Sequence, residues 1–161
     1  MGESTVIAHA LLTIVAVTMA SLFAGIAIFS SYEIGNSLQS IYKSISDKMR
    51  TEVTLVYIVY DDAGNVYRIY LKNTGLTPMT NLERMEVFLG PYGGELDYYT
   101  YSTTGGQGTW SYVEHGSQDG VWDVGELIEI VAYPPSAYAN PVKLILVTPT
   151  GAKMSFVEPA G

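Results

Sequence analysis

The chain begins with a long apolar run and then changes to a different pattern. No Asp, Glu, Lys or Arg occurs between Ser4 and Tyr32, and His9 is the only ionisable residue in the apolar stretch Val6–Phe29. A helix rises about 1.5 Å per residue, and about 20 apolar residues span a bilayer. Residues 1–32 are therefore predicted to form a single-pass N-terminal membrane anchor helix, which holds the chain in the membrane through residues 4–32.

Two other interpretations of this run are weaker. Cleaved signal peptides start with a positive region and carry about 7–15 apolar residues. Here Met1–Thr5 contains no Lys or Arg, and the apolar run is longer. A buried core helix of a soluble protein would need a domain large enough to enclose it, and the rest of this chain is small. We therefore expect an uncleaved anchor.

Apolar residues continue at helical spacing beyond the anchor. Their separations are four, three, four and four residues, which is close to a heptad repeat. Residues 33–51 are predicted to form a helical extension or linker. Its apolar stripe must pack either on the chain's own β domain or on another copy or a homologous partner. The stripe consists of Ile34, Leu38, Ile41, Ile45 and Met49.

From residue 52 onward the apolar residues alternate with a period of two. In 66–73, for example, Tyr67, Ile69 and Leu71 alternate with Arg68 and Lys72. Turn clusters rich in Gly, Asp and Asn separate such runs. Residues 52–161 are therefore predicted to form an all-β antiparallel sandwich of about eight short strands. The expected strands are 52–60, 66–73, 85–89, 96–101, 109–114, 126–133, 141–147 and 152–157.

Charge and composition exclude several functions. The region after residue 50 holds thirteen acidic and five basic residues, a net charge of −8 that repels phosphate backbones, so no nucleic-acid partner is expected. The absence of cysteine excludes disulfides and thiolate zinc sites. No serine has a base and an orienting group nearby in sequence, and the glycine-rich stretches lack the context of phosphate loops. We expect no enzyme, no cofactor and no small-molecule substrate.

One acidic stretch admits two interpretations. Asp119, Asp123 and Glu126 could place hard oxygen ligands around a Ca²⁺ ion, although their spacing does not match an EF-hand. Alternatively the stretch is a structural turn in which Trp122 plugs the end of the sandwich. The incomplete ligand set favours the turn.

Exposed strand edges and clustered tyrosines are the candidate interaction features. An edge presents free N–H and C=O groups that can recruit another chain. Tyr98, Tyr99 and Tyr101 lie beside glycine-rich stretches and suit a protein interface. Their other interpretation is as ordinary core and surface residues.

The helix, the heptad-like extension and the small sandwich are accompanied by a series of short motifs in a fixed order. These are Lys48–Thr51, Tyr70–Gly75, Val87–Gly90, Thr109–Tyr112, Asp119–Glu126 and Leu146–Gly151. This series resembles the archaellin-like superfamily, and most of all the G-type accessory proteins of the archaeal flagellum, or archaellum. The resemblance covers nearly the whole chain.

This resemblance implies a stator component that is held in the cell membrane by its helix. It further implies that the β domain lies outside the cell, facing the surface layer, with an F-type accessory protein and further copies of itself as partners. Lys43, Lys48 and Arg50 follow the span, and positive-inside counting alone would place the β domain in the cytoplasm.

Two further functions remain as alternatives. One is a filament-forming archaellin-like or pilin-like subunit. In the superfamily such subunits are made with a basic residue and glycine before the apolar run, whereas this sequence has Gly2 and no basic residue there. The other is a calcium-dependent surface adhesin.

Overall fold

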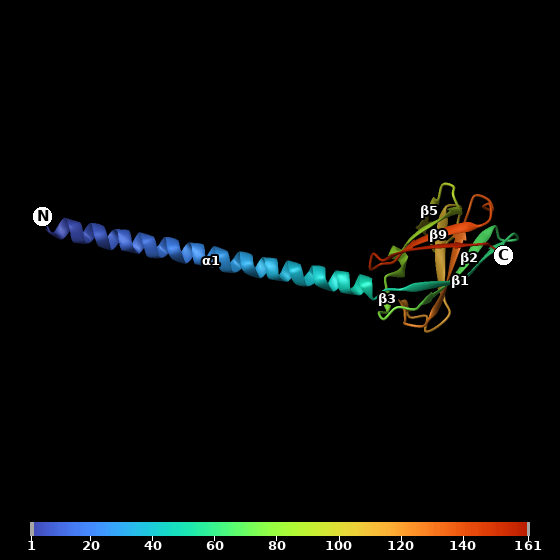
Figure 1. Ribbon diagram of the computed structural model, residues 1–161, viewed down its shortest axis with the longest axis horizontal. Helices are drawn as coiled ribbons and strands as arrows, with labels where there is room; N and C mark the ends of the chain where they lie inside the picture. The colour runs from blue at the N-terminus through green and yellow to red at the C-terminus, as the bar shows by residue number, and fades with distance from the viewer. Residues whose placement is uncertain (1, 161) are drawn as a thin grey trace. The chain divides into compact units, whose positions relative to one another are not determined.

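The computed structural model describes residues 2–160 and contains one helix followed by ten strands (Figure 1). The chain divides into two compact units, with the boundary between Lys43 and Ser44. The elements are α1 (Gly2–Met49), β1 (Val53–Asp61), β2 (Val66–Asn73), β3 (Met79–Thr80), η1 (Leu82–Arg84), β4 (Glu86–Pro91), β5 (Asp97–Tyr101), β6 (Thr109–Glu114), β7 (Val121–Trp122), β8 (Leu127–Tyr133), β9 (Val142–Val147) and β10 (Lys153–Glu158).

The helix α1 is a single element of 48 residues, so the anchor and its predicted extension form one continuous helix. Its sequence has no proline, the residue that most often breaks or kinks a helix. The helix ends where the Thr51 hydroxyl donates a hydrogen bond to the Asp47 carbonyl at 2.7 Å. Strand β1 begins two residues after Thr51.

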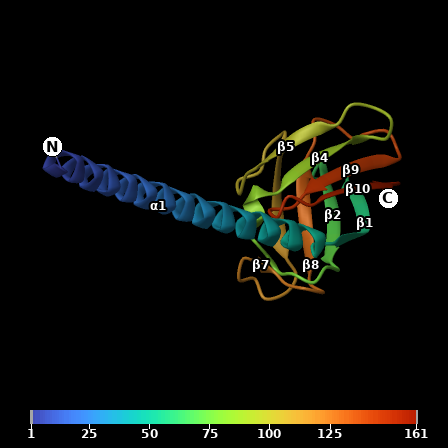
Figure 2. The ribbon, with the colours of Figure 1, turned by 60° about the vertical axis from the view of Figure 1, so that its left-hand side comes forward.

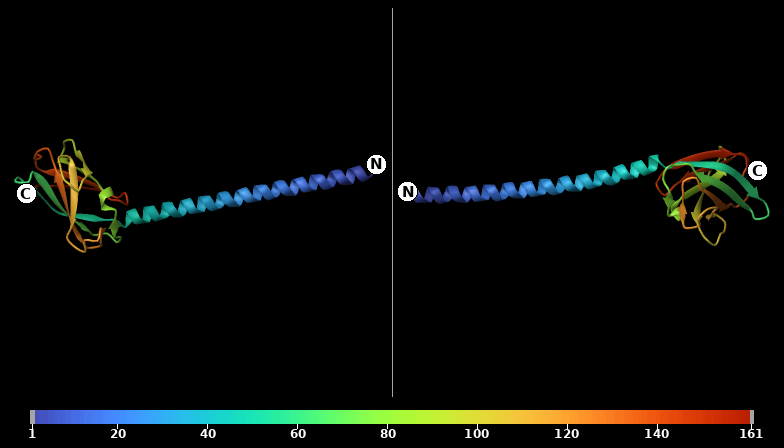
Figure 3. Two further views of the ribbon diagram at one scale, coloured as in Figure 1. Left: turned by 180° about the vertical axis from the view of Figure 1, so that it is seen from behind. Right: turned by 90° about the horizontal axis from the view of Figure 1, so that it is seen from below.

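Eight strands form one sheet in the order β1-β2-β8-β6-β5-β4-β9-β10, and β3 pairs with β7 separately. All neighbours in the large sheet are antiparallel except β5 and β6, which are parallel. The sheet curls so that its two edge strands, β1 and β10, come close to each other (Figures 2 and 3). The predicted all-β sandwich is confirmed, and eight of the ten strands match the predicted ones to within two residues at each end.

The core lies between the two halves of the curled sheet. Strand β2 places Tyr67, Ile69 and Leu71 inward, as its alternating sequence predicts. Strand β9 buries Val142, Leu144 and Leu146 from the opposite half in the same alternating way. Burying side chains of this size contributes about 1.5–3 kcal/mol each, so this core is a main source of the stability of the β domain.

The segment that leads into β1 is held by a set of loops that we call the collar: 73–76, 122–126 and 148–151. Asn73 is fully buried and is its centre. Its side-chain amide donates to the carbonyls of Thr77 at 3.1 Å and Trp122 at 3.0 Å, and its side-chain oxygen accepts from the Gly75 N–H at 3.1 Å. One buried amide therefore fixes two loops that are about fifty residues apart in sequence.

Two of the collar loops, 73–76 and 148–151, bond directly to the incoming chain. The N–H groups of Gly75 and Leu76 donate to the carbonyls of Glu52 and Arg50 at 2.9 and 2.8 Å. A side chain at Gly75 would come within 2.5 Å of the Arg50 carbonyl oxygen, so this position requires glycine. The Thr150 hydroxyl donates to the Thr51 hydroxyl at 3.0 Å. Three of the sequence motifs thus have one structural role, which is to secure residues 50–52.

Replacing Asn73 by Ala should destabilise the β domain strongly. The variant leaves two carbonyls and one N–H of the collar without their partner, which should lower the free energy of unfolding by about 2–4 kcal/mol. Urea unfolding of the full chain in detergent, followed by tryptophan fluorescence, measures this, because both tryptophans lie in the β domain. Gln107→Ala, which removes an exposed amide, is the matched control and should change little. Equal unfolding midpoints for the two variants would contradict the role assigned to Asn73.

Candidate interaction surfaces

The largest unpartnered surface is the apolar part of α1. By length and composition this helix can cross a membrane, and its large apolar side chains from Val6 to Phe29 are at least half exposed. The hydroxyl groups in the segment are satisfied by the helix itself, since those of Thr13, Thr18 and Ser21 donate to carbonyls three or four residues earlier. Such groups need no water, so the segment suits a hydrocarbon environment.

The predicted stripe lies on the same helix. At 100° per residue Ile34, Leu38, Ile41 and Ile45 share one face, and their side chains are 60, 48, 52 and 50% exposed. Met49, the last residue of α1, is 82% exposed. The first four residues of the stripe thus form an apolar row on an otherwise polar helix segment.

The three tyrosines suggested for an interface do not share one environment. Tyr98 and Tyr101 are 53 and 37% exposed, whereas Tyr99 is fully buried in the core. The Tyr99 and Tyr138 hydroxyls are 2.6 Å apart, and Tyr138 donates to Asp97 at 2.6 Å. Burial raises the pKa of Tyr99 to about 12, so it stays neutral. The suggestion that Tyr99 contacts a partner is therefore corrected, because its side chain is buried in the core of the β domain.

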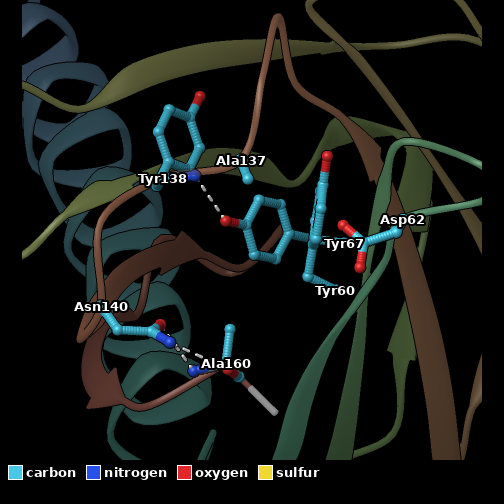
Figure 4. A pocket seen from close by; sticks show the side chains of 7 residues that line it. All are labelled: Tyr60, Asp62, Tyr67, Ala137, Tyr138, Asn140 and Ala160. Atoms are coloured by element: carbon cyan, nitrogen blue, oxygen red, sulfur yellow. Dashed lines mark hydrogen bonds between the residues drawn. The ribbon is translucent and has the colours of Figure 1, made fainter.

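A cavity of about 260 Å³ lies at the end of the β domain where β1 runs into β2 (Figure 4). Tyr60 and Tyr67 form its aromatic side, with ring centroids 4.8 Å apart. The Tyr67 hydroxyl accepts the backbone N–H of Tyr138 at 2.8 Å. Asn140 exchanges two hydrogen bonds with the backbone of Ala160, each 3.0 Å long. Most polar groups that line this cavity are already hydrogen-bonded within the domain, so we interpret the cavity as a packing feature.

Sequence reasoning missed a patch on the outer face of the β1-β2-β8 layer. We call it the aromatic–ionic patch: Tyr57, Arg68, Tyr70, His115 and Glu129. Arg68 Nη1 donates to Glu129 Oε1 at 2.7 Å, and His115 Nε2 lies 3.1 Å from Glu129 Oε2. Beside them the rings of Tyr57 and Tyr70 stack with centroids 4.2 Å apart.

The sequence signal for this patch was a single acidic residue, Glu129, inside an apolar strand. Its side chain is only 7% exposed although it faces outward, because its neighbours cover it. A carboxylate so buried needs charged or hydrogen-bonding partners. Arg68, from the adjacent strand, and His115, just after β6, supply them, and the result is a rigid surface that combines aromatic and charged groups.

The acidic stretch 115–126 forms a turn. The two carboxylate oxygens of Glu126 accept the N–H groups of Ser117 and Asp123, both at 2.8 Å. Asp119 Oδ1 accepts the Val121 N–H at 3.0 Å. Trp122 is fully buried, in agreement with the turn interpretation. Among the residues whose side chains the structure describes, no group of three or more His, Asp or Glu side chains could hold a metal ion.

The edge strands are protected against continued pairing. Strand β1 has a bulge between Leu55 and Tyr57, and bulges twist an edge away from regular pairing. Strand β10 carries the charged residues Lys153 and Glu158 at its two ends. The edges therefore offer less than the outer faces do for contact with another chain.

Comparison with known proteins identifies related folds. A family model for archaeal-type flagellin matches residues 2–158. No curated protein matches the chain. The archaellum periplasmic stator protein FlaG from Sulfolobus acidocaldarius is 23% identical with a TM-score of 0.55, over 66% of this chain and 98% of that chain.

Two further solved structures are similar. The periplasmic stator complex of FlaF and FlaG from the same organism matches at 23% identity and a TM-score of 0.54, over 66% of this chain and 88% of that chain. The archaeal flagellum of Methanospirillum hungatei strain JF1 matches at 15% identity and a TM-score of 0.65, over 96% of this chain and 93% of that chain. At these identities the likeness concerns the fold.

The ion pairs of Glu129 predict a pH dependence of stability. Burial acts to raise the pKa of Glu129, but hydrogen bonds from Arg68 and His115 outweigh it, so the pKa lies below its ordinary value. A carboxyl whose pKa is lowered by folding stabilises the fold above its unfolded pKa, about 4.3, and this contribution is lost as the pH falls through the folded pKa.

Glu129→Gln should therefore lower the free energy of unfolding at pH 7 by about 1–2 kcal/mol, discounted because Arg68 is partly exposed. The difference from wild type should shrink below about pH 4. Urea unfolding at a series of pH values measures both effects. Glu95→Gln, at an exposed carboxylate, is the control. A gap between Glu129→Gln and wild type that stayed constant from pH 7 to pH 3 would rule out the ion-pair explanation.

Proposed function

The chain belongs to the archaeal-type flagellin family, and on that premise we propose that it is a stator-type accessory component of the archaellum. In this proposal α1 anchors it in the cell membrane by a single pass, and the β domain makes the contacts with other envelope or archaellum proteins. The role is structural rather than enzymatic. A second copy of the chain and an F-type accessory protein are its proposed partners.

The observation that carries the proposal is the combination of an apolar helix with a FlaG-like β domain. The two FlaG structures correspond to about two thirds of this chain, a share close to that of the β domain. They supply the fold of the part that would work outside the membrane. The helix supplies what a stator needs in addition, which is attachment to a fixed layer.

The collar supports this assignment mechanically. A tether transmits force from its folded domain to its membrane helix through the short segment between them. Here residues 50–52 are bonded to two loops of the collar at once, through the Gly75 and Leu76 N–H groups and through Thr150. Force applied at this segment is shared by several hydrogen bonds that would have to break together. A loosely attached linker would let the helix turn without moving the domain.

We place the β domain on the outside of the membrane. The support is the periplasmic location in the descriptions of both FlaG structures. The positive-inside tendency of Lys43, Lys48 and Arg50 opposes this orientation. Asp47 and Glu52, which lie close by, do not offset this tendency, and we give more weight to the descriptions of the two FlaG structures.

The F-type partner is proposed by analogy with the FlaF and FlaG complex. The aromatic–ionic patch is the surface best suited to such a contact. It is rigid, it combines stacked tyrosines with an ordered arginine, and residues of both kinds are enriched at interfaces. Because the chain carries a net charge of −8, a partner surface of positive potential would be favoured there.

A filament subunit is the second candidate, and one observation favours it. The match to the Methanospirillum hungatei flagellum extends over 96% of this chain and therefore includes the helix. In that function the apolar helices would leave the bilayer and pack together in the core of a filament. The two candidates share one fold and differ in where the apolar helix resides.

Shearing of native cells separates the two candidates. We expect the chain to remain with the membrane pellet after filaments are sheared off, and to co-purify with an F-type accessory protein when those membranes are dissolved in mild detergent. Quantitative mass spectrometry of the sheared filaments and of the membrane fraction measures this, with a known filament subunit as the internal control. Recovery of most of the chain in the sheared filaments would refute the stator proposal and establish the filament subunit.

A further inference from the structure

The apolar row on α1 has the spacing of a coiled-coil seam. Ile34, Leu38, Ile41 and Ile45 follow one another at intervals of four, three and four residues. They are four large branched side chains, each between 48 and 60% exposed, on a segment whose other faces are mostly polar. Large apolar residues arranged in this way on a polar helix are stabilised when a second helix covers them. We call these four residues the pairing row.

The pairing row continues toward the N-terminus with the same spacing but with smaller residues. Most of its members inside the apolar segment are Ala, Thr or Ser, while larger apolar residues such as Leu22 and Phe29 lie on other faces. In lipid, small residues let helices approach closely, whereas in water branched apolar residues drive pairing. The continuation consists of Val6, Ala10, Thr13, Val17, Ala20, Ala24, Ala27 and Ser31.

We propose that α1 pairs with the α1 of a second copy, in parallel and in register, along the pairing row. This inference rests on the proposed function, because it takes the apolar segment to be in a membrane. The row changes from small to branched residues close to Phe29, where the apolar segment ends. A partner helix matches both parts only if its own row changes from small to branched residues at the same depth relative to the membrane. A second copy with the same orientation meets this condition without further requirement.

The charges around the row also fit a second copy. The positions beside it, which face the partner's flanks in a coiled coil, are Gly35, Ser37, Tyr42 and Ser44, and none carries a charge. Glu33, Lys43 and Asp47 fall on the outward face. From Ile34 to Ile45 two identical chains of net charge −8 can therefore bring these helices together without like charges meeting along the row. The seam ends there, because Lys48 occupies its next position. A partner selected by charge would instead need charged flanking positions.

Pairing would give the anchor a property that one helix lacks. A single helix can rotate freely about its axis in fluid lipid and resists torque poorly. Two helices joined along about forty residues cannot rotate independently. The two β domains would then be held to one shared membrane support.

Cysteine scanning tests the proposal directly, because the chain has no cysteine of its own. Single cysteines are placed at each position from Ile34 to Ile45 in the full chain, which is expressed alone in membranes and oxidised with copper phenanthroline. Disulfides require Cβ atoms about 3.5–4.5 Å apart, so Leu38→Cys should yield roughly tenfold more covalent dimer than its neighbour Gln39→Cys. Ile34→Cys, Ile41→Cys and Ile45→Cys should also be maxima, and Asn36→Cys and Lys43→Cys minima.

Each other outcome overturns the proposal. No dimer at any position would mean that the row is covered by the chain's own β domain, and dimer only after an F-type protein is added would mean a mixed pair. Maxima on several faces would indicate the larger helix bundle of a filament. The same samples show whether the chain is in the membrane fraction. Its absence from that fraction would refute the proposed function, whereas membrane location without the periodic dimer would refute only the pairing.

Discussion

The apolar surface of α1 is the constraint on which the rest of the account depends. From Val6 to Phe29 the helix exposes large apolar side chains in every direction, and its hydroxyl groups bond to its own backbone. Exposed to water, such a surface would be strongly unfavourable, since each large side chain contributes about 1.5–3 kcal/mol on burial. A bilayer, or a bundle of similar helices, removes this cost. Both candidate functions of this family member are solutions to the same requirement.

The β domain has a hydrophobic core of its own. Its core is closed by two halves of one curled sheet, and the buried Asn73 joins loops that are distant in sequence. The incoming chain is bonded at residues 50–52, so the domain begins immediately after the helix ends. In the proposed stator function, this short, bonded connection would carry force between the helix and the domain. Its contacts with partners can then vary on the outer faces while the core and the collar stay the same.

Much of the fold could be predicted from the sequence because it follows from local periodicity. The unbroken apolar run and the absence of proline before Pro78 indicate one long helix, and the alternation in 66–73 indicates which side of β2 is buried. The pair β3 and β7 was not predicted. Each strand has only two residues, which is too short for any periodic signal.

The interaction surfaces were harder to predict, for a physical reason in each case. Tyr98 and Tyr99 are adjacent in a strand with tyrosine on both faces, so the pattern cannot tell which one is buried. The partners of Glu129 come from β2 and from just after β6, and only the strand order brings them together. The acidic residues 119, 123 and 126 were considered as metal ligands, but two of them, Asp119 and Glu126, bond to backbone N–H groups of their own turn. Side-chain roles of this kind depend on tertiary contacts.

Protease protection in sealed lipid vesicles tests the central claim most directly. The full chain is reconstituted into vesicles, digested with a nonspecific protease and analysed by mass spectrometry of the lipid fraction. We expect one protected peptide that includes Val6–Phe29, together with a protease-resistant β domain outside the vesicles when the domain faces the medium. A chain that stays in the aqueous fraction, or whose apolar segment is digested as readily as an exposed loop, would contradict this claim.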